Sequence, residues 1–260
     1  MKLQVFVLLM IIASSGCGKK EKQKVYLSRS MSATEDFNQF GQENAQLLKT
    51  YTANDEVLQP DAEVPASGAI VKFGDTAVVI QVDSADRNSF RDKFSFVAFL
   101  NSHKTAMLVQ VADKSGLTAP FFILSVKQGK LDVVRLFRAS NGQGDKRFTK
   151  GLTAVGRSGY LVNNDFLITR VDAKVYPIPR QHPDERIQGL YFINSPDRKT
   201  LVFLVSSSLY QVNYPTGRVF TQPLSANVPK NPKDIFAWIQ ENYAWVTDKE
   251  GVSLDRKSVV

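Results

Sequence analysis

Cysteine and histidine are both scarce in this chain, which has one cysteine and two histidines among 260 residues. A single cysteine excludes disulfide bonds within the chain, so stability has to come from a hydrophobic core. The histidines, His103 and His182, lack a closely spaced set of carboxylates or thiols of the kind that binds zinc. We therefore expect no histidine- or cysteine-based metal site and no cofactor, whereas calcium binding through carboxylates stays open.

The signatures of common enzyme families are also missing. Gly156-Arg157-Ser158-Gly159 lacks the spacing of a nucleophile elbow, and no Walker loop or dinucleotide-binding glycine motif occurs. His182-Pro183-Asp184-Glu185 places a histidine beside two carboxylates, a pattern that a solvated loop explains better than a catalytic base. A pair of catalytic carboxylates stays open, because such residues need to be close only in the fold. We assign no catalytic residue.

Long apolar runs are absent as well, and the most informative short one lies at the N-terminus. It extends from Leu3 to Ala13, is broken only by Gln4, and is followed by small residues. At about 11 residues it is too short for a transmembrane helix, which needs about 20. A charged start, an apolar run and small residues form the layout of a secretory signal, so we predict that residues 1–16 are a cleaved signal peptide.

The sole cysteine, Cys17, follows this signal directly. Ser14-Ser15-Gly16-Cys17 resembles the lipobox of bacterial lipoproteins, although that family prefers Leu, Val or Ile where this chain has Ser14. The resemblance implies lipidation at Cys17, with a thioether-linked diacylglycerol and an acylated new N-terminus that bind membrane lipid. Gly18, in place of the Asp that resembles an inner-membrane retention signal, implies export to the outer membrane. The alternatives are a free thiol or cleavage by the ordinary signal peptidase.

The overall composition is that of a basic globular protein. With 43% hydrophobic and 22% charged residues, the chain lies outside the disordered class, and its net charge is +8. Part of this charge falls in residues 17–31, which we expect to be a tether. Each lysine near anionic lipid contributes about 1 kcal/mol to the free energy of membrane binding. The tether either adheres to the membrane or acts as a solvated spacer. Nucleic acid is not an expected partner, because the basic residues are scattered and the chain is exported.

The stretch after the tether has a helical pattern. Ser32 followed by Glu35 is typical of a helix start. Apolar residues then recur on roughly one face: Phe37, Phe40, Leu47 and Leu48. We predict an amphipathic helix over residues 32–51 that packs on the body of the protein, with partner binding as the alternative. A proline- and aspartate-containing connection follows over residues 52–68.

From residue 69 the apolar runs become short, rich in β-branched and aromatic residues, and separated by turn residues. This pattern predicts a β-rich domain over residues 69–260. The expected strands include 69–73, 77–82, 94–100, 106–111, 121–126, 131–137, 152–155, 159–163, 166–171 and 174–178.

Residues 187–224 carry the clearest pattern in the body. Phe192 to Leu204 resembles the strand, Ser-Pro-Asp-x-Lys-Thr turn and strand of TolB-like and WD40-like propeller blades. Ser208 to Asn213 and Arg218 to Phe220 resemble the outer hairpin of the same blade. A similar arrangement at Phe99 to Val109 lies about 93 residues upstream, or two blades. The fold class that we predict is all-β: a propeller-like or other antiparallel sheet assembly, preceded by one N-terminal amphipathic helix.

The C-terminal tail is rich in aromatic residues. Residues 234–242 are compatible with a helix or a strand, and residues 243–248 with a strand. Their aromatic side chains either pack in the core or form a binding patch: Phe236, Trp238, Tyr243 and Trp245.

Two functions fit these patterns. The first is a membrane-tethered lipoprotein of the bacterial cell envelope that acts as a non-catalytic binding or assembly module, for example of the immunity or exclusion type. Its partner would be an envelope protein or polymer. The second is an exported hydrolase that acts on envelope polymer through carboxylates. A cleft with two facing acids would favour the enzyme, and a concave surface of basic and aromatic residues would favour binding.

Overall fold

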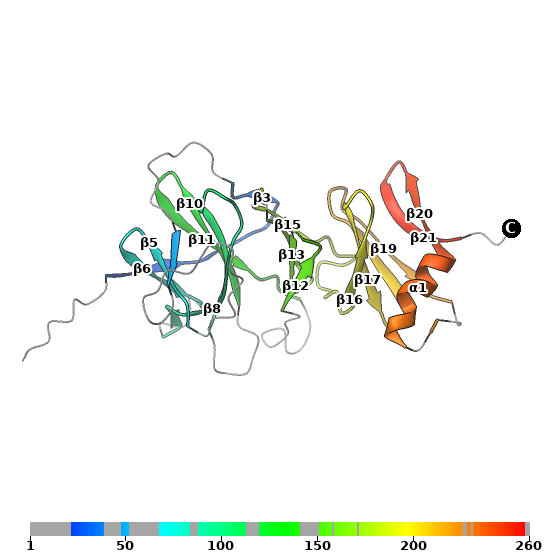
Figure 1. Ribbon diagram of the computed structural model, residues 1–260, viewed down its shortest axis with the longest axis horizontal. Coiled ribbons are helices and arrows are strands. Elements are labelled where there is room, and N and C mark those ends of the chain that lie inside the picture. The colour runs from blue at the N-terminus through cyan, green and yellow to red at the C-terminus, as the bar shows by residue number, and fades with distance from the viewer. Residues whose placement is uncertain are drawn as a thin grey trace, which may run out of the picture.

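The computed structural model describes residues 22–38, 48–51, 68–83, 88–112, 120–140, 151–157, 159–170, 172–225, 228–229 and 231–257. Its strands form five sheets, which we label A to E in the order of their place along the long axis of the molecule (Figure 1). Strands β5 and β6 of sheet A lie at one end of this row, and the hairpin of sheet E lies at the other (Figure 1).

Sheets A and B come first in the row. Sheet A has the order β1-β6-β5-β4, and β7 also pairs with β6. Its strands are β1 (Gln23–Leu27), β4 (Leu48–Tyr51), β5 (Ile70–Phe73), β6 (Thr76–Gln81) and β7 (Phe90–Arg91). Sheet B has the order β2-β11-β10-β9-β8. Its strands are β2 (Arg29–Ser30), β8 (Phe94–Phe99), β9 (Ala106–Val111), β10 (Phe121–Lys127) and β11 (Lys130–Leu136).

Sheets C, D and E continue the row. Sheet C has the order β12-β13-β14-β15-β3, and sheet D the order β16-β17-β18-β19. The strands of sheet C are β3 (Glu35–Asp36), β12 (Leu152–Val155), β13 (Gly159–Val162), β14 (Phe166–Thr169) and β15 (Lys174–Pro177). Those of sheet D are β16 (Leu190–Asn194), β17 (Thr200–Val205), β18 (Ser208–Asn213) and β19 (Arg218–Pro223). The helix α1 (Pro232–Asn242) precedes the hairpin of sheet E, β20 (Tyr243–Asp248) and β21 (Gly251–Arg256).

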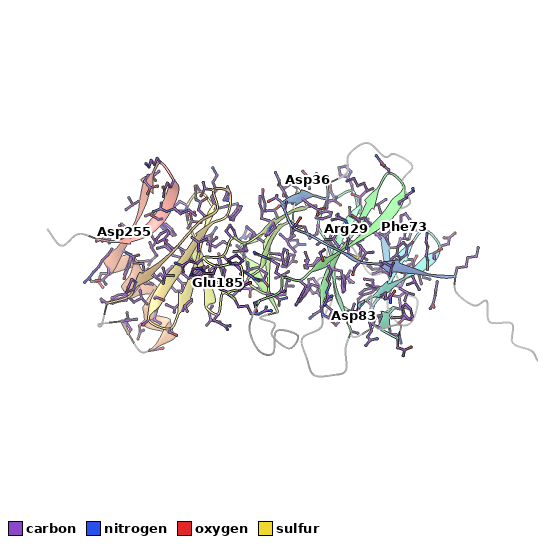
Figure 2. The ribbon with its side chains drawn as sticks, turned by 180° about the vertical axis from the view of Figure 1, so that it is seen from behind. Arg29, Asp36, Phe73, Asp83, Glu185 and Asp255 are labelled. Atoms are coloured by element: carbon purple, nitrogen blue, oxygen red, sulfur yellow. The ribbon has the colours of Figure 1, made fainter. Side chains whose placement is uncertain are left out.

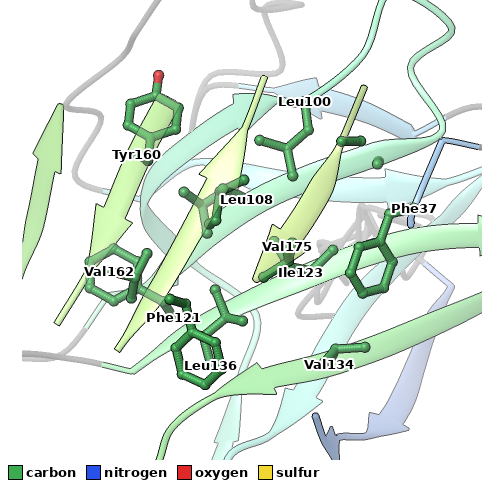
Figure 3. Close-up of a cluster of buried hydrophobic side chains, with 14 of the residues drawn as sticks. Phe37, Leu100, Leu108, Phe121, Ile123, Val134, Leu136, Tyr160, Val162 and Val175 are labelled. Carbon is green, nitrogen blue, oxygen red and sulfur yellow. The ribbon is translucent and has the colours of Figure 1, made fainter. Parts of the chain in front are cut away.

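The middle sheets are buried on both faces, which explains their continuous apolar runs. In β10, Phe121 and Ile123 pack in the core between sheets B and C, whereas Phe122 and Leu124 pack in the core between A and B. Successive side chains of a strand point to opposite faces, so a strand between two cores needs apolar residues at every position. Figure 3 shows the B–C core, in which Phe121 and Ile123 lie among side chains of both sheets.

The antiparallel β prediction is confirmed, but the ring of a propeller is absent from the described part of the chain. The face of sheet D that points away from sheet C packs against α1 and sheet E through Val202, Leu209, Ile239 and Leu254. That face is therefore occupied and cannot pack against sheet A. The sheets form an open row with sheets A and E at its two ends (Figure 1).

The N-terminal segment, residues 22–38, does not form the predicted elements. Residues 23–30, which we expected in the tether, contain β1 and β2, and β3 occupies the start of the expected helix. The helix prediction for residues 32–51 is wrong at both ends, because β4 follows at Leu48–Tyr51; residues 39–47 lie outside the described residues. Backbone pairing with other strands replaces the local preference for a helix, as tertiary contacts often do.

This segment joins three sheets. Strand β1 pairs in parallel with β6, β2 in parallel with β11, and β3 antiparallel with β15. Arg29 connects two of the sheets, since its Nη1 donates to Glu35 Oε1 at 2.7 Å and its Nη2 to Asp132 Oδ2 at 2.7 Å. The hydrogen bonds to Glu35 and Asp132 raise the pKa of the Arg29 guanidinium above its ordinary value. Arg29 lies near the middle of the row in Figure 2.

Candidate functional site

A pocket of about 590 Å³ opens at one end of the junction between sheets C and D, and we call it the C–D pocket. Its wall comes from the β12–β13 turn, the end of β14, the β16–β17 turn and the residue after β18. The volume lies within the range of about 300–1,000 Å³ that is usual for ligand sites. The polar and aromatic side chains that line it are Arg157, Thr169, Asp172, Asn194, Arg198 and Tyr214.

Glycine shapes the sheet C wall of the pocket. Gly156 has a φ of 61°, a left-handed conformation that the turn before Arg157 requires. A Cβ atom at Gly159 would lie 3.2 Å from the carbonyl oxygens of Ile168 and Val155. The two glycines therefore let β12 and β13 reverse tightly, and Arg157 lies exposed between them.

The sheet D wall is the Ser-Pro-Asp-x-Lys-Thr turn that the sequence predicted. Asp197 Oδ1 accepts hydrogen bonds from Ser195 Oγ at 2.5 Å and from the backbone N–H of Lys199 at 3.1 Å. The hydrogen bond from Ser195 is the main reason that the pKa of Asp197 lies below its usual value. The turn presents Arg198, whose φ is 62°, at the edge of the pocket.

The charge of the pocket is mainly positive. Arg157 and Arg198 are both exposed, and neither forms an ion pair with a residue that the structure describes. Asp172 is the carboxylate that lines the pocket, and it accepts a hydrogen bond from Thr169 Oγ1. The Asp197 carboxylate belongs to the turn of the sheet D wall, where it binds Ser195 and the backbone of Lys199. Two guanidinium groups without an ion-pair partner in the described structure make the pocket suitable for an acidic ligand group, which arginine can bind through two parallel hydrogen bonds.

Aromatic rings complete the wall. Tyr214 packs against Tyr176 with ring centroids 4.8 Å apart, and its hydroxyl donates to the backbone oxygen of Arg198 at 3.1 Å. Burial raises the pKa of Tyr214 to about 12. The phenol therefore stays protonated near neutral pH and keeps this hydrogen bond to the turn.

The opposite end of the same junction is closed by a buried ion-pair cluster, which we define as Asp165, Arg180 and Arg186. Arg180 Nη2 lies 2.6 Å from Asp165 Oδ1, and Arg186 Nη1 lies 3.8 Å from Asp165 Oδ2. The exposed fractions of these side chains are 3%, 2% and 7%. Burial raises the pKa of Asp165, while the hydrogen bond and the charge of Arg180 oppose that shift.

Backbone groups hold this cluster in place. Asn164 donates its side-chain N–H groups to the carbonyl oxygens of Ile187, at 2.9 Å, and of Gly189, at 2.8 Å. Arg180 Nη1 donates to the carbonyl oxygen of Ala139 at 2.9 Å. Most polar side-chain atoms at this end bind within the protein, although Arg180 Nε is buried without a hydrogen-bond partner among the described residues. The cluster therefore stabilises the contact between sheets C and D.

The carboxylates of the His182-Pro183-Asp184-Glu185 segment do not form a catalytic pair. Glu185 Oε1 accepts hydrogen bonds from the hydroxyl of Tyr210 and, at 2.7 Å, from the backbone N–H of Gln181. His182 and Asp184 are exposed on the loop. Glu185 lies at the C–D junction in Figure 2, where it closes the loop over sheet D.

The other residues singled out in the sequence have separate positions. Cys17 lies outside the described residues. His103 is exposed in the turn between β8 and β9, far along the chain from His182. In the tail, Tyr243 is buried and Trp238 and Trp245 pack against the core between sheets D and E, whereas Phe236 is 45% exposed.

Sequence reasoning did not identify the ion-pair cluster or the C–D pocket as sites. Arg157 appeared only within a glycine motif that lacks the spacing of a nucleophile elbow, and Asp165 follows Asn163 and Asn164 in a segment whose composition is typical of a turn. One feature of the sequence could have identified Asp165, namely its position directly before the apolar run of β14. A charged residue that is buried beside such a strand needs a partner of opposite charge.

The described residues contain no group of three or more histidine, cysteine, aspartate or glutamate residues positioned to hold a metal ion. Within the same residues, no helix is long and apolar enough to span a membrane.

Comparisons with known proteins give no relative from which a function could be transferred. No family model matches this chain, and searches of curated proteins and of solved structures give no significant match.

Proposed function

We propose that this protein is a lipid-anchored lipoprotein of the bacterial cell envelope, at the outer membrane, that acts as a non-catalytic binding or assembly module. Its anchor would be the lipid on Cys17, and its partner an envelope protein or polymer that presents an acidic group to the C–D pocket. The observation that carries the binding part is the charge of that pocket, in which Arg157 and Arg198 have no ion-pair partner among the described residues.

The chemistry of the pocket supports binding more than hydrolysis. A carboxylate-based hydrolase needs two acids that face each other across the substrate. Asp172 lines the pocket, Asp197 accepts hydrogen bonds within its own turn, and the buried Asp165 faces two arginines at the other end of the junction. A groove with two free guanidinium groups and a tyrosine wall has the composition of a recognition site, since arginine and tyrosine are enriched where proteins bind partners.

The anchor is tested by fractionation of cells that produce the Cys17→Ser variant. The variant should incorporate no labelled palmitate, because it lacks the thiol that is lipidated. It should also move from the membrane to the soluble fraction, because two or three acyl chains are needed for stable attachment. Variant protein that still carries the label would contradict the anchor.

The pocket is tested with the double variant Arg157→Glu/Arg198→Glu. It should lose the envelope component that the wild type captures from detergent-solubilised envelopes, since an acidic ligand group would then meet two carboxylates. The matched control is Lys127→Glu/Lys130→Glu, which makes the same charge change at the exposed β10–β11 turn of sheet B. Equal capture by the two double variants would refute the pocket as the binding site.

A further inference from the structure

One strand edge in the row differs from its counterparts. Sheets A, B and C each receive an extra strand from the N-terminal segment: β1 pairs with β6, β2 with β11 and β3 with β15. In sheets B and C the partner is the last strand of the sheet along the chain, whereas in sheet A the short strand β7 follows β6. Sheet D ends at its last strand, β19, which pairs only with β18 among the strands of the described chain. Sheet D therefore lacks the added strand that the three preceding sheets have.

The free groups of β19 can be identified from its register. Leu224 N donates to Ser207 O at 2.8 Å, and bonded and non-bonded pairs alternate along antiparallel strands. The N–H groups of Val219 and Thr221 therefore point away from β18, and neither has a hydrogen-bond partner within the described chain. Pro223 has no N–H and ends the edge.

This free edge is as long as two of the three edges that the chain itself fills, while the third, on β6, pairs with five residues of β1. Strands β2 and β3 each consist of two residues, and β3 still holds its place beside β15 through Glu35 and Asp36. Two outward-facing residues on β19 thus offer a ladder of the same size. Unpaired edge groups are the template on which an extended peptide adds to a sheet.

The N-terminal segment also shows what side chain such a strand carries. Large apolar side chains of this segment, at or beside its paired residues, lie between the sheets. Tyr26 packs against the A–B core, and Met31 and Phe37 lie in the B–C core (Figure 3 shows Phe37). No residue of 22–38 belongs to the C–D core. Beside β19, that core ends in the half-buried side chains of Tyr176, Tyr214 and Val219.

We propose that β19 binds an extended peptide segment of another protein as a fifth strand of sheet D, with one large apolar side chain of that segment inserted beside Val219 and Tyr214. We infer the kind of occupant from the edges of β6, β11 and β15, which each pair with an extended segment that carries an apolar side chain at or near the pairing. The hydrogen-bonding edge of β19 is separate from Arg157 and Arg198, although the apolar anchor lies against Tyr214, which also lines the C–D pocket. Loss of binding in Arg157→Glu/Arg198→Glu and loss of binding in Thr221→Pro therefore report separately on the arginines and on the edge.

The test uses the full-length protein with Thr221→Pro and, as the matched control, Thr221→Val. Both change an exposed side chain, but only proline removes the outward N–H. Each protein is purified from detergent-solubilised envelopes, and amide hydrogen exchange is measured over 218–223 in the purified complex and after removal of bound proteins. Thermal unfolding of the two variants within about 2 °C of each other shows that both are folded.

The expected result has three parts. Wild type and Thr221→Val retain a co-purifying protein that Thr221→Pro loses, and the amides of Val219 and Thr221 exchange at least about tenfold more slowly in the complex. Retention of that protein by Thr221→Pro, or equal exchange in the two states, would overturn the proposal. The remaining outcome is measured by sedimentation of the isolated chain. If the chain self-associates and Thr221→Pro abolishes that association, the occupant of the edge is a second copy of this chain, and the proposal of a foreign peptide is overturned.

Discussion

Both ends of the junction between sheets C and D contain two arginines, but the arginines are buried at one end and exposed at the other. At one end Arg180 and Arg186 are buried and paired with Asp165, and at the other Arg157 and Arg198 are exposed without an ion-pair partner in the described structure. The comparison shows that arginine alone does not mark a binding site. What distinguishes the two ends is whether the protein supplies a carboxylate to the guanidinium groups, as Asp165 does at the buried end.

The physical reason is the cost of burial. An arginine out of contact with water needs a carboxylate and hydrogen-bond acceptors, and the closed end supplies both. An exposed arginine is solvated by water and can exchange that water for an acidic ligand. The first kind of arginine holds the sheets together, and the second is available to a partner.

The largest expected effect is at the closed end. Asp165→Ala leaves Arg180 and Arg186 buried without their carboxylate, so the free energy of unfolding should fall by about 3–5 kcal/mol in a denaturant titration. The matched control is Asp172→Ala at the open end, where the carboxylate is exposed and the expected loss is below about 1 kcal/mol. Equal losses for the two variants would remove the distinction between the ends.

A smaller effect is expected at Asn164, which also belongs to the closed end. Asn164→Ala removes both hydrogen bonds to the carbonyl oxygens of Ile187 and Gly189 and leaves those groups buried without a donor. The loss should be about 2 kcal/mol in the same titration. A loss below about 0.5 kcal/mol would mean that water replaces the amide and that this end is more open than the structure shows.

The smallest effect concerns pH at the open end. The pKa of Asp197 is lowered in the folded protein, so its contribution to stability is complete above the ordinary value of 3.8 and is lost as the pH falls through the lowered pKa. Thermal unfolding followed from pH 5 to pH 2 should show a slightly steeper decline for the wild type than for Asp197→Asn. Identical slopes would show that the ionised carboxylate does not stabilise the turn.

The sequence predicted sheet D well because its information is local. The strands around Ser195 to Lys199 and the hairpin from Ser208 to Phe220 follow from turn chemistry and short apolar runs, and all four strands are present. The similar arrangement two blades upstream also corresponds to a strand pair, β8 and β9, joined by a turn in which Asn101 accepts from the backbone of Thr105.

The N-terminal segment shows where local information ends. Ser32, Glu35 and Phe37 fit a helix start, yet Glu35 pairs with Val175 and Phe37 is 3% exposed between sheets B and C. Pairing partners more than 100 residues away cannot be read from periodicity. The same limit applies to the C–D pocket, whose wall combines turns from two sheets.

The sequence alone predicted most strands from residue 69 onward, the tight turns between them and the all-β class, because alternating burial and turn residues act within a few positions of the chain. It also supplied the prediction of a lipid anchor at Cys17. Only the tertiary structure decided that the sheets stand in an open row, which arginines are paired and that β19 receives no strand from the N-terminal segment. Those properties depend on which faces and edges meet, and the chain brings them together from distant positions.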